Sequence, residues 1–240
     1  TFEIALALAK RDGSDIVTWY KDPLFRPALT LMRKLGFNVD QATPCNIARK
    51  YRLEGVKGFV TNNVFAHATE ESTLRIAHPI KHFYAWRHLI RRELHRDVRF
   101  IDKLLYEDFP WWSEIMLLNP RVTITQLPFY YYFPNPKSID LGSSVARKIK
   151  NWLIGLEYAC DLYAKRATPE QMALWSRQCK WSVIHHSVAR MLPSVNEAAQ
   201  RQELRDTLSH LWTQGVFSDP HDGMTQRVQQ DLALFIEQRN

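Results

Sequence analysis

Apolar positions in the first part of the chain change between helical and strand-like spacing. Residues 1–10 combine apolar and alanine positions at helical spacing, and Gly13 is a typical residue to end such a helix. Residues 15–20 are rich in β-branched and aromatic side chains, and 55–64 have a similar character, so both segments are expected to be strands. The succession of a helix and then strands predicts an α/β fold.

The middle of the chain predicts two further helices and a strand. The second half of 70–93 is expected to be helical because four apolar residues recur there at helical spacing. Residues 107–118 are expected to form the next helix, and 122–127 a strand that leads into an aromatic run. The four apolar positions of the first of these helices are Phe83, Trp86, Ile90 and Leu94.

Beyond residue 141 the pattern predicts helices only. Two segments have the sequence of a capping box, Thr168-Pro169-Glu170-Gln171 and Ser194-Val195-Asn196-Glu197, and each is expected to start a helix. We therefore predict an α/β domain over 1–140, with a partial mixed sheet and flanking helices, and an all-helical subdomain over 141–240. An apolar stripe marks the first helix of that subdomain: Val145, Ile149, Trp152, Leu153, Leu156 and Cys160.

Composition narrows the class of partner without choosing one. The 32 basic residues exceed the 25 acidic ones and give a net charge of +7, which favours sugar nucleotides, anionic lipid headgroups or nucleic acid. Cys45, Cys160 and Cys179 are odd in number and lack metal-ligand spacing, so reduced thiols packed as small core residues are expected. The sequence has no apolar run of membrane-spanning length and no signal peptide, which predicts a soluble or peripheral protein.

The segment Tyr106-Glu107-Asp108-Phe109-Pro110-Trp111-Trp112 carries the clearest candidate chemistry. An ionised carboxylate at a helix start can take a proton from an alcohol, which is a poor nucleophile at neutral pH. The plainer interpretation is that Asp108 only caps the helix. Both interpretations stay open on the residues alone.

Aromatic side chains follow the acidic pair and recur in the run from Phe129 to Phe133. Rings of this kind stack on the apolar face of a sugar, although at such spacing they are more often core residues. Helical spacing places Trp112 inside and Trp111 toward a cleft. In the aromatic run, strand alternation sends Tyr130 and Tyr132 to one side and Tyr131 to the other.

A basic cluster precedes the acidic pair, on or near one expected helix. It is either a solvated helix face or an anion site for a pyrophosphate or a phosphorylated acceptor. His185 and His186 have no suitably spaced carboxylate or cysteine, so we do not expect them to bind a metal. The members of the basic cluster are His82, Arg87, His88, Arg91, Arg92, His95 and Arg96.

The order of motifs from Trp86 to Ile139 resembles the acceptor half of family 2 glycosyltransferases with the GT-A fold. The resemblance implies that Asp108 is the catalytic base and that Glu107 supports or orients the site. It also implies that Trp111, Trp86, Arg91, Tyr130, Tyr132 and Lys137 bind substrate. The motifs are Trp86 with Arg91 and Arg92, Arg99-Phe100, Glu107-Asp108, the strand 122–127, Tyr130 to Tyr132, and Ser138-Ile139.

By the same resemblance, the activity is inverting transfer of a sugar from a nucleotide diphosphate to a glycan or glycolipid hydroxyl. The implied setting is the synthesis of bacterial surface polysaccharide or lipopolysaccharide in the cytoplasm, at the inner face of the inner membrane, with peripheral contact to anionic lipid. A divalent metal, Mn²⁺ or Mg²⁺, is expected for the complete enzyme, with ligands that are not in this chain.

The chain departs from the family pattern in two places. The nucleotide-binding segment with an Asp-x-Asp type motif does not precede Thr1, so we expect the chain to lack most of a donor site and to transfer little sugar by itself. Phe133 also stands where many relatives have an arginine, which leaves Lys137 for a basic contact.

Two other functions fit the composition. One is a catalytically inactive, glycosyltransferase-like scaffold or interaction protein whose last hundred residues dock a partner. The other is a basic module that binds single-stranded nucleic acid, although the chain has no named nucleic-acid motif and its acidic pair would repel phosphates. The donor sugar, the linkage and the oligomeric state do not follow from the sequence.

Overall fold

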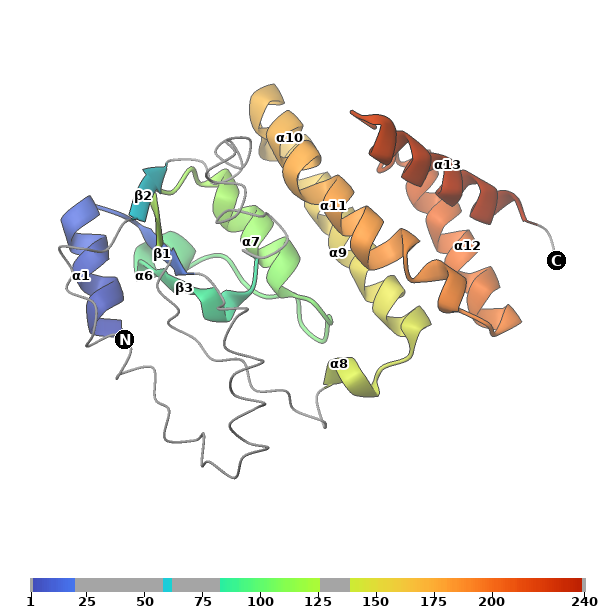
Figure 1. Cartoon of the computed structure of the whole chain (residues 1–240), viewed down its shortest axis with the longest axis horizontal. Coiled ribbons are helices and arrows are strands. Elements are labelled where there is room, and N and C mark those ends of the chain that lie inside the picture. Colours follow the sequence, from blue (N-terminus) through green and yellow to red (C-terminus); the bar gives the residue numbers. More distant parts are fainter. Residues whose placement is uncertain (1, 20–57, 62–82, 126–138, 239–240) are drawn as a thin grey trace, which may run out of the picture. The chain divides into compact units, whose positions relative to one another are not determined.

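The computed structural model describes residues 2–19, 58–61, 83–125 and 139–238. The chain has an α/β fold with a small mixed sheet and mostly helical content, and it divides into two compact units that are described separately (Figure 1). The first unit contains the sheet, and the second contains α7 and the helices from α8 onward. The domain boundary expected near residue 140 stays a prediction.

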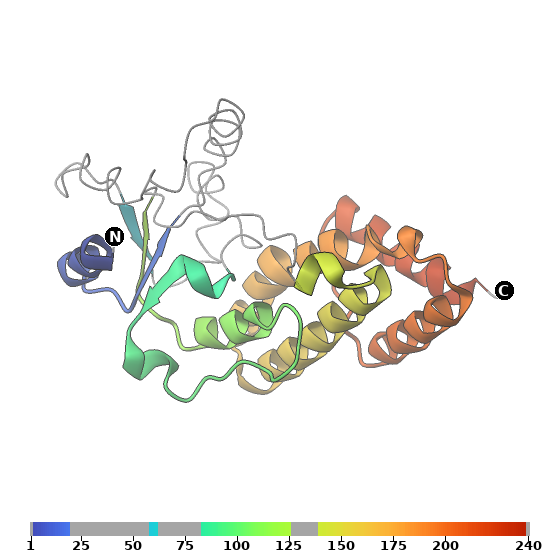
Figure 2. The same cartoon turned by 90° about the horizontal axis from the view of Figure 1, so that it is seen from below.

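Four strands of the described residues form the sheet of the first unit, in the order β2-β4-β1-β3 (Figure 2). The two central strands are parallel to each other, and each pairs with an antiparallel strand on its outer side. Segments distant in the sequence therefore supply all the pairings. The strands are β1 (Ile16–Trp19), β2 (Gly58–Thr61), β3 (His88–Ile90) and β4 (Val122–Thr125).

Helix α1 (Phe2–Asp12) packs its apolar face against the sheet and confirms the predicted helix over 1–10. Leu8 lies with Val17 and Trp19 in one buried cluster. Gly13 then ends the helix in the left-handed conformation, with a φ of 62°, which suits a residue without a Cβ. The predicted strand at 15–20 follows directly as β1.

The helix predicted in the second half of 70–93 is wrong for the residues that are described there. Residues 85–87 form the 3₁₀ turn η4 (Ala85–Arg87), and α6 (Arg92–His95) is a single turn. Between them lies β3, whose backbone pairs with β1. Without β3, the backbone groups on that edge of β1 would lack these hydrogen-bond partners. The strand pairing decided the structure, because only four apolar residues supported a helix.

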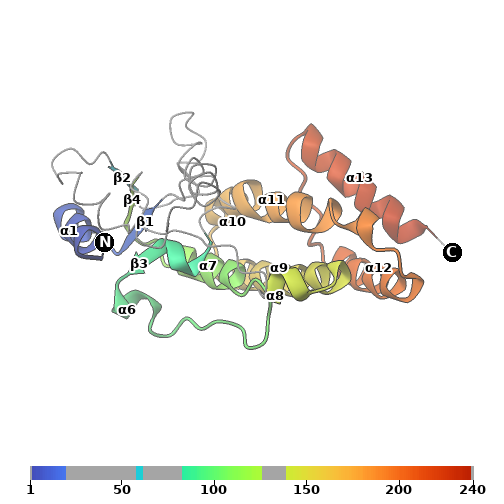
Figure 3. The same ribbon diagram turned by 60° about the horizontal axis from the view of Figure 1, so that its bottom comes forward.

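The second unit is a set of packed helices. The segments from α10 to η6 follow one another along α9, and α12 packs against both α9 and α13 (Figures 1 and 3). The stripe predicted for the first helix is buried on α9, except that Val145 and Cys160 are only partly buried. The helical segments are α7 (Asp108–Leu117), α8 (Ile139–Gly142), α9 (Val145–Arg166), α10 (Pro169–Trp175), η5 (Ser176–Lys180), α11 (Trp181–Val183), η6 (Ile184–Ala189), η7 (Leu192–Ser194), α12 (Ala198–Thr213) and α13 (Gly223–Glu237).

Two of the helix starts test the predicted capping boxes. Thr168 and Gln171 form the reciprocal box at the start of α10, as predicted. Ser194 does not start a helix, because it ends η7, and α12 begins after Glu197 without a side-chain cap. A further box, formed by Asp222 and Thr225 at the start of α13, was not predicted. None of the described helices is both long and apolar enough to span a membrane.

The two described cysteines are free thiols inside the second unit. Cys179 of η5 is fully buried and Cys160 of α9 is partly buried, while Cys45 lies outside the described residues. Burial in an apolar environment disfavours a thiolate. It raises the pKa of Cys160 to about 11 and that of Cys179 still further.

We expect the free energy of unfolding to fall as the pH rises above the pKa of an unfolded thiol. Between about pH 8.5 and the raised folded values, the folded chain binds more protons than the unfolded chain, so each thiol lowers stability by up to about 1.4 kcal/mol per pH unit. Urea unfolding at about pH 8 and about pH 10 measures this loss. The variant Cys179→Ala should lose less than the wild type over the same interval, and equal losses would contradict the assignment.

Candidate functional site

Glu107 and Asp108 lie where a loop of the second unit turns into α7. Asp108 is the first residue of the helix, and both side chains are half-buried. The partial positive charge of a helix start attracts a carboxylate. Pro110 follows in the first turn, where its missing N–H leaves no helical hydrogen bond unmade. The predicted helix at 107–118 is therefore confirmed, with an acidic pair at its start.

The backbone immediately before the pair is strained. Tyr106 has a φ of 64°, in the left-handed region that bulky residues rarely adopt, and Lys103 has a φ of 60°. Each such residue costs on the order of 1–3 kcal/mol, so the surrounding structure must impose the conformation. The ring of Tyr106 stacks on the ring of Trp152, with centroids 4.3 Å apart and planes 12° from parallel. Trp152 thus supports the strained backbone at 103–106, called the corner below, which leads directly into Glu107 and Asp108.

Asn151, the neighbour of Trp152 on α9, holds the same corner by its backbone. The backbone N–H of Leu105 donates to Asn151 Oδ1 at 2.8 Å. The amide nitrogen of Asn151 donates in turn to the carbonyl oxygen of Arg147 at 2.8 Å, which sets the orientation of the side chain. Two consecutive residues of one long helix therefore hold the loop by a hydrogen bond and a ring contact.

Helix α7 is packed firmly against α9, which determines the direction of its first turn. Gly155 of α9 faces the start of α7, and a Cβ there would make ordinary van der Waals contact, at 3.5 Å, with atoms of both Phe109 and Pro110. Farther along, the hydroxyl of Tyr163 donates to the carbonyl oxygen of Ser113 at 3.1 Å. The indole N–H of Trp175 donates to the hydroxyl oxygen of Ser113 at 3.2 Å. These buried polar contacts join α7 to α9 and to the end of α10.

The two tryptophans of α7 are both buried. Trp112 is fully buried, as predicted. Trp111 is only 6% exposed, so the expectation that it faces an open cleft is corrected. Its ring is covered by that of Phe100, with centroids 5.0 Å apart and planes 27° from parallel. Because the loop before α7 folds back over the helix, Phe100, which is 47% exposed, is the accessible ring of this pair.

Trp86 and Arg91, the predicted substrate-binding residues ahead of the acidic pair, belong to the first unit. The half-buried ring of Trp86 stacks on Tyr84 with centroids 5.3 Å apart. Arg91 makes an ion pair with Asp15 at 3.1 Å, so an anionic ligand there would compete with that carboxylate. The other predicted substrate-binding residues, Tyr130, Tyr132 and Lys137, lie outside the described residues.

The basic cluster of the sequence is not one helix face. Arg87 is buried and donates from Nε and Nη2 to the carbonyl oxygen of Trp19, at 2.9 and 2.6 Å. His88 is buried on β3, and His82 lies outside the described residues. Arg87 therefore joins η4 to the last residue of β1, and the helical spacing of the sequence did not reveal this structural role. Arg91, Arg92 and Arg96 are the exposed arginines that remain of the cluster.

The described residues contain no gathering of three or more His, Cys, Asp or Glu side chains that would bind a metal. Mn²⁺ and Mg²⁺ prefer several oxygen ligands arranged around one point. The described part of the chain does not fit that requirement, so we assign no step of the chemistry to a metal.

The residues that shape the corner were missed by the sequence analysis. Trp152 was identified only as part of an apolar stripe, and neither Asn151 nor Tyr106 was given a task. The left-handed conformation of Tyr106 has no signal in the sequence, because tyrosine rarely adopts it. Phe100 was recognised only as part of a motif.

No family model, curated protein or solved structure matches the chain. The family resemblance therefore depends only on the motifs quoted above. The geometry provides two half-buried carboxylates at a rigid helix start, and an exposed aromatic ring in the same unit. Such an arrangement can abstract a proton from a hydroxyl group and stack on a sugar ring.

Proposed function

We propose that the chain is the acceptor-side and C-terminal part of an inverting family 2 glycosyltransferase with a GT-A fold. The observation that supports this best is Asp108, half-buried at the start of α7, behind a strained corner held by Asn151 and Trp152. Strained backbone that is retained beside ionisable groups is frequent at functional sites. The small mixed sheet of the first unit is compatible with part of such a fold.

In this proposal Asp108 acts as the general base. It takes the proton of an acceptor hydroxyl as the oxygen attacks the anomeric carbon of the donor sugar. The new bond joins that oxygen to the anomeric carbon, and the broken bond joins the carbon to the diphosphate, which leaves as a nucleoside diphosphate. Attack from the face opposite the leaving group inverts the configuration. A base in a fixed position favours this geometry, because misplacement by one ångström costs a large part of the rate.

Glu107 has a supporting role in the proposal. Its carbonyl oxygen accepts the N–H of Trp111 at 3.3 Å, so its backbone already belongs to the first turn. Its half-buried carboxylate is adjacent in sequence to Asp108 and provides a second acceptor for sugar hydroxyls. We assign the setting, the synthesis of bacterial surface polysaccharide or lipopolysaccharide at the inner membrane, from the family resemblance alone.

Phe100 takes the stacking role that the sequence suggested for Trp111. Its ring is exposed, and its contact with the buried Trp111 fixes its orientation. We expect Phe100→Ala to raise the KM for the acceptor by roughly 3- to 10-fold with little change in kcat, because an aromatic contact contributes about 0.5–1.5 kcal/mol. Steady-state kinetics with varied acceptor measures this. An unchanged KM would exclude Phe100 from acceptor binding.

Release of nucleoside diphosphate tests the proposed function. Protein expressed from the complete native gene is mixed with UDP-glucose, UDP-galactose, UDP-N-acetylglucosamine or GDP-mannose. The acceptor is lipopolysaccharide from a strain in which the gene is deleted. Diphosphate release that requires both substrates, together with growth of the glycan on a gel, would support the proposal. If no donor reacts and gene deletion leaves the surface glycan unchanged, sugar transfer is wrong and the scaffold hypothesis replaces it.

A further inference from the structure

The second unit contains a cavity of about 580 Å³ that the proposed transfer chemistry does not use. It lies along η6 and the first three turns of α13. Its volume falls within the roughly 300–1,000 Å³ typical of small-ligand sites. The lining residues are His185, Ala189, Arg190, Gly223, Met224, Arg227, Val228 and Asp231.

A π-helical turn gathers the lining residues of the first wall. The backbone N–H of Arg190 donates to the carbonyl oxygen of His185 at 3.1 Å, across five residues. In a regular α-helix, residues five apart differ by about 140° around the axis. The wider π turn brings them to nearly the same side, and such turns are frequent at functional sites. Arg190 and His185 therefore line one cavity because the helix is locally widened.

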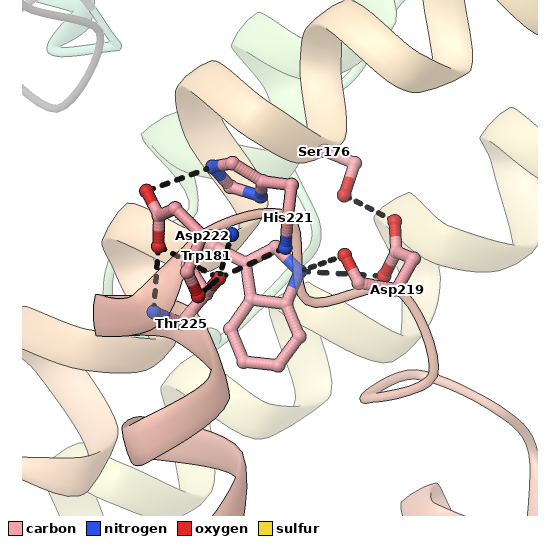
Figure 4. Close-up of polar contacts among 6 residues, drawn as sticks. All are labelled: Ser176, Trp181, Asp219, His221, Asp222 and Thr225. Atoms are coloured by element: carbon pink, nitrogen blue, oxygen red, sulfur yellow. Dashed lines mark hydrogen bonds and ion pairs between the residues drawn. The ribbon is translucent and has the colours of Figure 1, made fainter.

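The second wall is one face of α13. Gly223, Arg227 and Asp231 follow each other at intervals of four residues, and Gly223 adds no side chain to fill the space. The start of α13 is fixed by Asp222, whose carboxylate accepts the N–H of Thr225 at 2.8 Å (Figure 4).

The turn before α13 is anchored on the helices it crosses. The indole N–H of Trp181 donates to the carbonyl oxygen of Asp219 at 2.9 Å (Figure 4). Ser176 and Lys180 both contact the Asp219 carboxylate. Both walls of the cavity are therefore held in place by contacts outside it.

The cavity lining has a net positive charge, because it contains two arginines and one carboxylate. Neither Arg190 nor Arg227 makes a side-chain hydrogen bond or ion pair with any described residue, and Asp231 is the one carboxylate in the lining. Nδ1 of His185 is buried without a hydrogen-bond partner in the described part of the chain. An unpaired buried nitrogen costs free energy, so one residue of the cavity lining has an unmet polar group.

We propose that this cavity binds a phosphate-bearing ligand. A phosphate offers three or four oxygens and satisfies two guanidinium forks at once, whereas a single carboxylate is satisfied by one. Arg190 and Arg227 hold the phosphate from opposite walls, and Asp231 accepts a hydrogen bond from a neighbouring hydroxyl of the ligand. The site is independent of Asp108 and of the sugar-transfer proposal.

Calorimetric titration of the full chain with inorganic pyrophosphate and with uridine diphosphate, at low salt, tests the site. A parallel arm measures binding to phosphatidylcholine vesicles with and without phosphatidylglycerol, which separates a lipid headgroup from a free phosphate. We expect the Arg190→Ala and Arg227→Ala variants each to weaken binding by roughly tenfold or more, as expected for a charge-assisted contact. Both side chains are exposed, so neither change should disturb folding.

Arg177→Ala is the matched control, because Arg177 is exposed, lies on the neighbouring π-helical segment η5, and does not line the cavity. It should leave binding within about twofold of the wild type. Binding by either arm that is lost only in the cavity variants supports the site. Failure of every phosphate probe to bind, or an equal loss in Arg177→Ala, would overturn it. Sugar transfer by Asp108 would be unaffected by either result.

Discussion

Sugar transfer is expected to fall at least about 100-fold, and up to roughly 10,000-fold, when Asp108 is replaced by Asn, because a general base contributes this much to the rate. The amide keeps the shape of the side chain but does not take a proton at neutral pH. Since the backbone corner is held by Asn151 and Trp152, the fold should be unchanged. Steady-state rates of nucleoside diphosphate release measure the loss, and donor affinity should stay within about twofold.

Asp102→Asn is the matched control for this experiment. Asp102 is an exposed aspartate in the loop before α7, and the same charge is removed without touching the helix start. It should keep nearly full activity. Glu107→Gln should have a smaller effect than Asp108→Asn, since Glu107 supports the site and does not take the proton. Turnover of Asp108→Asn comparable to that of Asp102→Asn would refute the role of Asp108 as the base.

Replacing Trp152 with Ala is expected to give the largest loss of stability among the variants proposed here, about 3–5 kcal/mol. The ring is only 6% exposed and contacts three others, those of Phe83, Tyr106 and Phe109. Its removal leaves a cavity and also removes the contact that holds Tyr106 in its left-handed conformation. Urea unfolding monitored by circular dichroism measures the change.

Trp212→Ala provides the comparison for Trp152→Ala. Trp212 is 36% exposed on α12, and Phe217 is its one ring contact among the described residues. Its loss should cost about 1 kcal/mol, in the range usual for partly exposed positions. Similar losses for the two variants would show that the ring contacts of Trp152 are not the main support of the corner. A conservative Trp152→Phe change should keep part of the stability, because a ring remains to pack against Tyr106.

The elements that the sequence predicted correctly have local causes. The helix before Gly13 ends there because glycine accepts a positive φ, and the box at Thr168 satisfies the free N–H groups of α10 within four residues. The helix at 107–118 follows from an acidic start, an early proline and apolar spacing. Each of these signals acts over one or two turns, so distant parts of the chain hardly alter the outcome.

Three of the wrong predictions involve partners that lie outside the local sequence pattern. Residues 88–90 form a strand because β1, some seventy residues earlier, offered unpaired backbone groups. Arg87 is buried because the carbonyl oxygen at the end of β1 accepts its guanidinium hydrogens. Trp111 is buried because Phe100 folds over it. None of these partners is visible from local spacing.

The amino-acid sequence by itself determined the α/β class, the helical character of the last hundred residues, and the placement of Glu107 and Asp108 at a helix start. Capping chemistry and apolar periodicity act locally, and this is why they can be read from the order of residues. Only the tertiary structure decided the strained corner at Tyr106, its support by Asn151 and Trp152, and the cavity between η6 and α13. These features depend on packing between segments far apart in the chain. Many tertiary contacts together stabilise a backbone conformation that is locally unfavourable.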